Sequence, residues 1–388
     1  MDNNYSLDLS CLSKELRLLL EILKTEDNDS IGVVKKELFI DIDWGGFLQL
    51  AWHHRVYPFI YSKLKKADDN RIPPYVIQTL CKEFKKNTLQ MLLLSGEMEQ
   101  VSELFTENQI RLLYLKGPVI AADIYGDISL RTSKDLDILI SITDLKSAEE
   151  LLLSIGYEKE VVPNFLNEWK WRRHHVVYFH PQKNIQLELH WRFQSFPMKE
   201  PKFNELWERK RVSTLTSYPV YFLGKEDLFL YLISHGARHG WFRLRWLLDI
   251  DQMLRKGLKL EDINSLLSKY QNRKLVGQAL ILASELLKTH MNEGWEKLTE
   301  GTDSKKIAQN AIDFIKGTES LETIMSSECY QYYSLSLKSN LQRFFVFLIL
   351  FYPNSADPMT LRVPKPLHFL YFPLRPLLVV WRKTRKLS

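Results

Sequence analysis

The sequence predicts an α+β protein in which a small mixed sheet lies between two helical regions. Apolar residues recur at helical spacing through residues 1–95 and 196–388, whereas short stretches within residues 96–195 alternate apolar and polar residues as strands do. Two of these alternating stretches also carry carboxylates. We therefore divide the chain into an N-terminal helical region, an α/β core of residues 96–195, and a C-terminal helical region with a proline-containing strap.

The N-terminal region is expected to contain three helices. The first covers the leucines between residues 9 and 23, the second follows Asp43-Trp44, and the third begins at Pro73-Pro74. Pro58 predicts a break or a kink, because proline inside a helix removes a backbone hydrogen bond. The run His53-His54-Arg55 is interpreted as the end of a helix near solvent, with a direct catalytic role as the less favoured alternative.

The core is expected to begin with a helix over residues 97–107 and a strand over residues 110–115, which leads into Lys116-Gly117. Glycine permits a tight turn, and Pro118 suits the first position of the next helix. Because the N-terminus of a helix offers free amides to a phosphate, Lys116 and Gly117 are predicted to bind a triphosphate. A plain turn from strand to helix is the alternative.

Two strands are predicted to carry the acidic residues of a site. Asp135 and Asp137 are two residues apart in the first strand, so both project from the same face. A second alternating stretch, residues 185–191, carries Glu188 on the same face as His190. If the strands are neighbours, three carboxylates converge, and their mutual repulsion favours a bound cation. Oxygen ligands favour Mg²⁺, with Mn²⁺ as the alternative.

Other polar residues are expected around this acidic cluster. Arg131, Ser133 and Lys134 directly precede the first acidic strand and are expected to contact a triphosphate or the pyrophosphate that leaves it. The basic and aromatic run over residues 169–175 ends at His175, which is a candidate for contact with a nucleobase or an acceptor. A strand edge beside the rim of the site is the alternative interpretation of this run.

A pair of histidines completes the candidate residues. His235 and His239 are four residues apart and share one face of a predicted helix. No third metal-binding motif supports zinc at this pair, and polar packing against Asp249 or the core is the alternative.

These motifs resemble a bacterial family of uncharacterised nucleotidyltransferases within the DNA polymerase beta-like superfamily. The resemblance is carried by residues 51–58, 115–117, 131–139, 188–191, 235–239 and 375–376. It implies a polymerase-beta-like nucleotidyltransferase core and Mg²⁺-dependent transfer of a nucleoside monophosphate from an NTP to a hydroxyl or a phosphate. The acceptor is an unknown small molecule, saccharide or peptide. Because residues 235–239 belong to the shared pattern, the resemblance leaves a role in a substrate pocket open for His235 and His239, together with His175 and His190.

The resemblance also implies roles for the three acids. Asp135, Asp137 and Glu188 would hold the metal ions that activate the attacking hydroxyl and bind the triphosphate, and Glu188 would accept the hydroxyl proton. The turn at Gly117-Pro118 departs from the Gly-Ser or Gly-Gly that is usual in the superfamily. Two alternatives therefore stay open. One is a non-catalytic nucleotide-binding module, and the other is a different transfer at the same metal site, such as a sugar or sugar-phosphate onto a phosphorylated peptide in natural-product tailoring.

Composition narrows the remaining classes of function. The 388 residues are 45% hydrophobic and 26% charged, as in ordinary globular proteins, and carry a net charge of +6. That mild excess suits anionic substrates but does not call for a stable nucleic-acid partner. Three widely spaced cysteines and a polar N-terminus predict a cytoplasmic protein.

The C-terminal region contains the longest apolar run, residues 344–352, which is about half as long as a membrane-spanning helix. We expect this run to form a buried helix. Several prolines between residues 353 and 376 suggest a strap folded over the body, and residues 377–386 mix Trp381 with basic residues. Peripheral contact with an anionic membrane and a solvated basic tail are the two interpretations of this end, and the tail is preferred.

Overall fold

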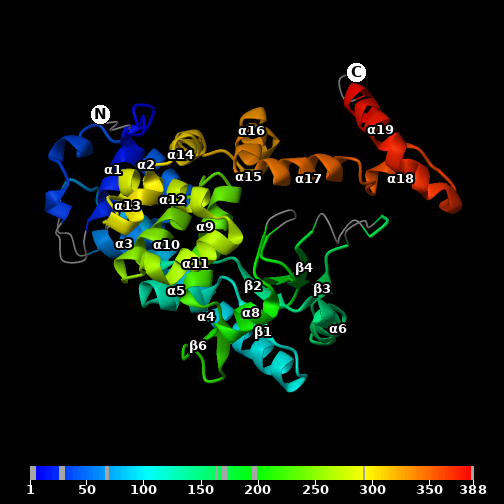
Figure 1. Cartoon of the computed structure of the whole chain (residues 1–388). Helices are drawn as coiled ribbons and strands as arrows, with labels where there is room; N and C mark the ends of the chain where they lie inside the picture. Colours follow the sequence, from blue (N-terminus) through cyan, green and yellow to red (C-terminus); the bar gives the residue numbers. More distant parts are fainter. Residues whose placement is uncertain are drawn as a thin grey trace.

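The computed structural model describes residues 6–25, 31–65, 70–161, 165–167, 173–194, 199–291 and 293–385. Within these ranges, helices from both ends of the chain form one body beside a seven-stranded mixed sheet, and a helical arm projects from the C-terminal end (Figure 1). The expected combination of helices with a mixed sheet is therefore confirmed. The polymerase-beta-like arrangement of its core stays a prediction.

Helices from the two ends of the chain pack against each other, as α1 does against α12. The N-terminal helices are α1 (Lys14–Lys24), α2 (Trp44–His53), α3 (Tyr57–Leu64) and α4 (Pro74–Glu107). The helices that alternate with or follow the strands are α5 (Pro118–Tyr125), α6 (Leu145–Ser154), α8 (Phe203–Glu208), α9 (Lys225–Arg238), α10 (Leu244–Arg255), α11 (Leu260–Tyr270), α12 (Arg273–Leu287), α13 (Glu293–Thr299), α14 (Thr302–Ile315), α15 (Leu321–Ser326) and α16 (Glu328–Ser336).

The sheet has the strand order β3-β4-β5-β2-β1-β7-β6. Its strands are β1 (Leu112–Tyr114), β2 (Asp135–Ile140), β3 (Glu158–Lys159), β4 (His175–His180), β5 (Ile185–His190), β6 (Arg211–Ser213) and β7 (Val220–Phe222). The central strand β2 pairs with β1 in antiparallel and with β5 in parallel orientation. The two acidic strands predicted from the sequence are therefore both present, and they are neighbours.

The two faces of β2 have different environments, as its alternating sequence requires. Leu136, Ile138 and Ile140 are fully buried, and the long helix α4 packs against β2. The opposite face carries Asp135 and Asp137. Burial of one face therefore fixes the direction in which both carboxylates point.

The turn after β1 has the conformation that its sequence predicts. Gly117 adopts φ +101°, a region that side chains with a Cβ rarely enter, and directly precedes α5. Pro118 occupies the first turn of α5, where its missing N–H costs nothing. The predicted break at Pro58 is also confirmed, since α2 ends at His53 and α3 begins at Tyr57.

Two details differ from the expectation, and one predicted segment lies outside the described residues. His54 is completely buried rather than near solvent, because its backbone oxygen and Nδ1 accept hydrogen bonds from Arg245 and Leu244. A single helix, α4, runs through the boundary expected at residues 95 and 96. Residues 169–172 lie outside the described ranges.

The end of the chain forms an arm, defined here as residues 340–385, which comprises α17 (Asn340–Leu350), α18 (Ala356–Thr360) and α19 (Tyr371–Arg385). The expectation of a buried helix at residues 344–352 is wrong, because α17 has no buried residue. The segment between residues 353 and 376, which was expected to be a strap, does not fold over the body. It projects away from the body with the rest of the arm (Figure 1). No helix in the described ranges is long and apolar enough to cross a membrane.

Candidate active site

The register between β2 and β5 brings the predicted acidic residues together. Asp137 lies directly opposite Glu188, and Asp135 lies opposite Gln186. Residues paired across adjacent strands point to the same face of a sheet. Both aspartates, Glu188 and His190 therefore face the same space, as their spacing predicted.

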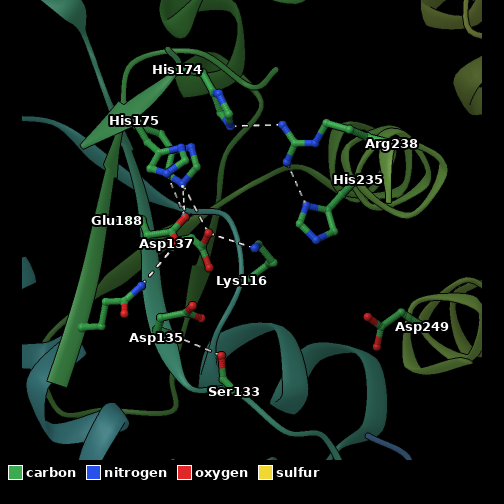
Figure 2. A network of polar contacts seen from close by, with 12 residues as sticks. Lys116, Ser133, Asp135, Asp137, His174, His175, Glu188, His235, Arg238 and Asp249 are labelled. Atoms are coloured by element: carbon green, nitrogen blue, oxygen red, sulfur yellow. Dashed lines mark hydrogen bonds and ion pairs between the residues drawn. The ribbon is translucent and has the colours of Figure 1, made fainter. Parts of the chain in front are cut away.

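Asp137 is the centre of the polar contacts in this space (Figure 2). The Lys116 Nζ lies 2.9 Å from Asp137 Oδ1, and the His190 Nε2 lies 3.2 Å from the same oxygen. His190 Nε2 is also 3.3 Å from Glu188 Oε2, so one imidazole nitrogen connects the two acids. His175 Nε2 approaches Glu188 Oε2 to 3.8 Å.

The surroundings of the two aspartates shift their pKa values in opposite directions. Burial opposes ionisation of Asp137, but Lys116 and His190 outweigh it and hold the pKa of this carboxyl well below its ordinary value. Burial and then repulsion from Asp137 raise the pKa of Asp135. Asp135 has no ion-pair partner in the described residues. It is therefore the acid most in need of an added positive charge.

The donor atoms at the centre of the site fit a divalent cation. Asp137, Glu188 and His190 each offer one ligand atom, and these atoms lie within 4.8 Å of one another. The second carboxylate oxygen of Asp137 is buried without a hydrogen-bond partner in the described structure. Such an orphaned oxygen is costly unless it binds something. Asp135 shares the face but is outside this group of three.

A second group of possible ligand atoms comprises His174, His175 and His190, which also lie within 4.8 Å of one another. His174 is already engaged, because its Nε2 accepts a hydrogen bond from Arg238 Nη1 over 3.0 Å. The Arg238 Nη2 lies 3.4 Å from His235 Nδ1 (Figure 2). These contacts connect β4 to α9 across the space above the acids.

A cavity of about 490 Å³ encloses this space, and most of the predicted site residues line it. The residues from the sequence prediction that line the cavity are Lys116, Arg131, Ser133, Asp135, Asp137, His175, Glu188, His190, His235 and His239. Gly117 and Lys134 do not line it. Lys134 lines a neighbouring cavity of about 620 Å³, which shares Arg55, Ser133 and Arg243 with the first.

Three arginines of the cavity wall were missed as site residues by sequence reasoning. Arg55 follows α2, Arg243 directly precedes α10, and Arg245 lies in its first turn. None of the three forms an ion pair with a carboxylate in the described part of the chain. Burial and then neighbouring arginines lower the pKa of Arg55 and of Arg243 to about 10 and that of Arg245 to about 9.

These arginines form what we call the cationic wall: Arg55, Arg243 and Arg245. Arg245 is buried and donates hydrogen bonds to Thr132, whereas Arg55 and Arg243 are partly buried. Mutual repulsion of these guanidinium groups, which have no carboxylate partner in the described residues, destabilises the empty site. A bound anion would relieve it, and guanidinium groups suit phosphate oxygens. The available signals in the sequence were the His53-His54-Arg55 run and the alternate spacing of Arg243 and Arg245. Neither signal shows that the two segments meet.

Arg131 has a different partner from the one predicted for it. Its Nε and Nη2 donate to the two carboxylate oxygens of Asp249 on α10, over 2.9 and 3.0 Å, and the pair is buried. Tyr125 donates a further hydrogen bond of 2.8 Å to Asp249. Contact between Arg131 and a triphosphate stays a prediction, while its structural role is to anchor the segment that leads into β2.

The buried histidines predict a pH dependence of stability. Burial lowers the pKa of His54 to about 3, and burial with repulsion from His190 lowers that of His175 to about 4. The unfolded chain, with histidine pKa values near 6.5, therefore binds protons that the native state does not bind below that pH. Each such group is expected to cost about 1.4 kcal/mol per pH unit below about 6.5.

This loss can be measured as urea midpoints of the metal-free protein at pH 7 and pH 5. His54→Gln should show a smaller decrease than the wild type, because one proton-linked group is removed. His190 has the opposite sign, since hydrogen bonds to Asp137 and Glu188 overcome burial and raise its pKa. Its stabilisation is present below about pH 6.5 and is lost as pH rises through the raised value. Equal decreases in the wild type and in His54→Gln would contradict the buried, neutral state of His54.

Comparison with known proteins identifies the chain as a nucleotidyltransferase. The sequence profile of the family described as "Uncharacterised nucleotidyltransferase" matches residues 41–288, well over half of the chain. The chain therefore belongs to this family, and transfer of a nucleotidyl group is the general activity that the family defines. The match includes the acidic strands and the cationic wall but ends before residues 375–376.

No curated protein matches the sequence. Among solved structures, the chain is similar to an antigenic nucleotidyltransferase-like protein from Paracoccidioides brasiliensis, with 15% identity and a TM-score of 0.31. That similarity covers 52% of this chain and 94% of the other chain.

Proposed function

We propose that the protein is a metal-dependent nucleotidyltransferase that moves a nucleoside monophosphate from an NTP to a hydroxyl or phosphate of its acceptor. One observation carries this proposal. An acidic cluster that fits a cation lies in the same cavity as three arginines without carboxylate partners in the described residues. A polyphosphate that binds the arginines and shares a cation with the acids would satisfy both sets of charges.

The metal would be held by Asp137, Glu188 and His190, with Asp135 available on the same face. When bound, a divalent cation supplies Lewis-acid stabilisation of negative charge on phosphate oxygens. Mg²⁺ prefers oxygen ligands, whereas Mn²⁺ also accepts an imidazole nitrogen. The presence of His190 among the ligand atoms therefore favours Mn²⁺ more than the three acids alone would.

Glu188 is placed to accept the proton of the attacking hydroxyl. Burial opposes its ionisation, but the hydrogen bond with His190 lowers its pKa below the ordinary value. The carboxylate is thus ionised at neutral pH and able to accept a proton. Its side chain retains some exposure to the cavity, whereas Asp137 is fully buried.

The donor phosphates would lie along the cationic wall. Arg55, Ser133 and Arg243 line both cavities, and Lys134 lines the second one. Guanidinium groups can donate two parallel hydrogen bonds to one phosphate, which fixes position as well as charge. Positioning and charge stabilisation supply most of the rate of phosphoryl-transfer chemistry.

The same cavity also offers an aromatic surface for the nucleobase or the acceptor. The His239 ring stacks on Trp246, with ring centroids 5.3 Å apart and planes 27° from parallel. His235 packs edge-on against the same indole. Flat aromatic groups of this kind accept planar or apolar faces of a ligand. We therefore assign His235 and His239 to the substrate pocket, the role that the family resemblance left open for them.

A thermal-shift panel tests the proposal directly. The purified protein is heated with ATP, CTP, GTP or UTP, each with Mg²⁺, with Mn²⁺ and without metal. A ligand that binds the native state raises its stability by about 2.7 kcal/mol at a hundred times its dissociation constant. We expect a metal-dependent rise in Tm with at least one NTP and a reduced rise in Arg243→Gln.

Lys146→Gln is the matched control, because Lys146 is an exposed cation on α6 outside both cavities. Its response to each NTP should equal that of the wild type. If no NTP raises Tm under any metal condition, the donor is not a simple NTP and the proposal fails. A rise that needs no metal and survives in Asp135→Asn would favour a non-catalytic nucleotide-binding module.

A further inference from the structure

Most apolar side chains of the helix α17 are exposed in the described structure. It begins the arm and projects away from the body (Figure 1). None of its residues is buried. A helix that is apolar on all sides is normally found inside a protein or a membrane, not in water. The exposed apolar side chains of α17 and the residue after it are Leu341, Phe344, Phe345, Phe347, Leu348, Leu350 and Phe351.

The second long helix of the arm, α19, continues this surface on one side. Leu377, Val380 and Trp381 are exposed at helical spacing. Its other side is fixed to α18, because Arg375 and Arg382 both form ion pairs with the fully buried Asp357. The arm is thus held in a defined shape that exposes its apolar side chains.

The charge of this segment is strongly one-sided. Residues 340–388 contain eight lysine and arginine residues but only one acidic residue, Asp357. Asp357 is buried and paired with two of the arginines. Arg362 and Lys365 lie between α18 and α19, are exposed, and have no carboxylate partner in the described residues. The exposed surface is therefore both apolar and cationic.

We propose that the arm docks on the surface of a membrane that contains anionic lipids. Aromatic and aliphatic side chains would enter the boundary between headgroups and acyl chains, and the cations would contact lipid phosphates. α17 has 11 residues and is about 16 Å long, too short to cross a hydrocarbon core of about 30 Å. It therefore lies in the interface rather than across the bilayer.

Charge argues against the other occupants of this surface. A second copy of the arm would place two cationic segments side by side, which raises the free energy of the dimer. A nucleic acid would use the cations but would leave the aliphatic side chains of α17 in water. Only a surface that is apolar within and anionic outside complements both features.

The arm also contacts residues 165–167, which lie outside the strands of the sheet. Tyr352 donates a hydrogen bond of 2.6 Å to the backbone oxygen of Leu166, and the Phe165 ring packs against His368 and Tyr371. Residues 165–167 belong to the connection between β3 and β4. The position of the arm is therefore linked to the chain on both sides, at α16 and beside β4. This proposal does not depend on the proposed function.

The test is flotation of the full-length protein with lipid vesicles. One set contains phosphatidylcholine alone, and the other also contains phosphatidylglycerol. We expect binding to be about tenfold stronger with the anionic lipid, because each exposed cation near such a surface adds affinity. Added salt should weaken this difference by screening the charges.

Two double variants separate the apolar and the cationic contributions. Phe344→Gln with Phe347→Gln should reduce binding to both vesicles about tenfold or more, because both rings are over half exposed and would enter the membrane. Arg362→Gln with Lys365→Gln should remove most of the preference for anionic lipid. Leu89→Gln with Leu93→Gln is the matched control, since these residues form an exposed apolar pair on α4.

Three outcomes would overturn the proposal. The first is the absence of vesicle binding by the wild type when its circular dichroism spectrum shows that the protein is folded and helical. The second is equal loss of binding in the α4 control and in the α17 variant. The third is a concentration-dependent dimer that disappears in the α17 variant while vesicles have no effect, which would identify a second copy as the partner.

Discussion

Asp135→Asn is expected to abolish metal-dependent nucleotide binding and turnover while leaving the metal-free protein as stable as the wild type or slightly more stable. Asp135 has no ion-pair partner in the described residues, and its pKa is raised by burial and by repulsion from Asp137. Removing its charge therefore relieves repulsion in the empty site. The same change removes the carboxylate that lies on the same face as the three proposed metal ligands and that we expect to help hold the metal.

Asp137→Asn is expected to abolish the same activity but to lower stability. Lys116 and His190 both contact Asp137 Oδ1 and are themselves largely buried. Loss of the carboxylate leaves a buried ammonium without its partner, and breaking a buried pair in this way costs about 3–5 kcal/mol. The two substitutions should therefore change the stability of the metal-free protein differently: Asp137→Asn lowers it, and Asp135→Asn leaves it unchanged or raises it slightly.

The measurement combines urea unfolding of the metal-free variants with release of pyrophosphate from the NTP identified by thermal shift. Glu150→Gln on the exposed face of α6 serves as a control for removal of a carboxylate. Full turnover in either aspartate variant would exclude the proposed metal site. A large loss of stability in Asp135→Asn would show that its charge is compensated by a partner and that the site is not strained when empty.

Local patterns were sufficient to predict the acidic strands and the turn before α5. Alternation with a period of two determines which face of β2 carries Asp135 and Asp137, and one buried face fixes that choice. Gly117 and Pro118 determine their turn through backbone sterics alone. That the two acidic strands are neighbours was stated only as a condition, and their parallel orientation was not predicted, because a strand sequence does not specify its neighbour.

Features that depend on contacts between distant segments were not predictable in this way. The cationic wall combines Arg55 with Arg243 and Arg245, and His54 is buried by hydrogen bonds from the same distant segment. The sequence of an apolar run such as that of α17 does not show whether a protein core or another surface covers it. Its exposure is a property of the tertiary structure, which explains why the expectation of a buried helix was wrong.

The pairing of Arg131 with Asp249 is another such long-range contact, and it predicts the largest loss of stability outside the metal site. Asp249→Asn is expected to destabilise the protein by about 3–5 kcal/mol, because Arg131 would remain charged in the interior without its partner. Both side chains are almost completely buried, and two hydrogen bonds of 2.9 and 3.0 Å connect them. The segment leading into β2 should lose its anchor on α10 at the same time.

The chain contains a matched control for the effect of burial. Arg211 and Asp123 form an ion pair with the same two-bond geometry, over 2.7 and 2.8 Å, but both side chains are partly exposed. Exposed pairs contribute about 0–1 kcal/mol. Asp123→Asn should therefore shift the urea midpoint far less than Asp249→Asn does.

A double variant, Arg131→Met with Asp249→Leu, tests the cause of the loss. Replacing both charges with apolar groups removes the uncompensated guanidinium, so this variant should be more stable than Asp249→Asn alone. The Tyr125 hydroxyl, which donates to Asp249, would still lose its acceptor and limit the recovery. If the double variant is instead less stable than Asp249→Asn, the loss comes from packing around α10 and not from a stranded charge.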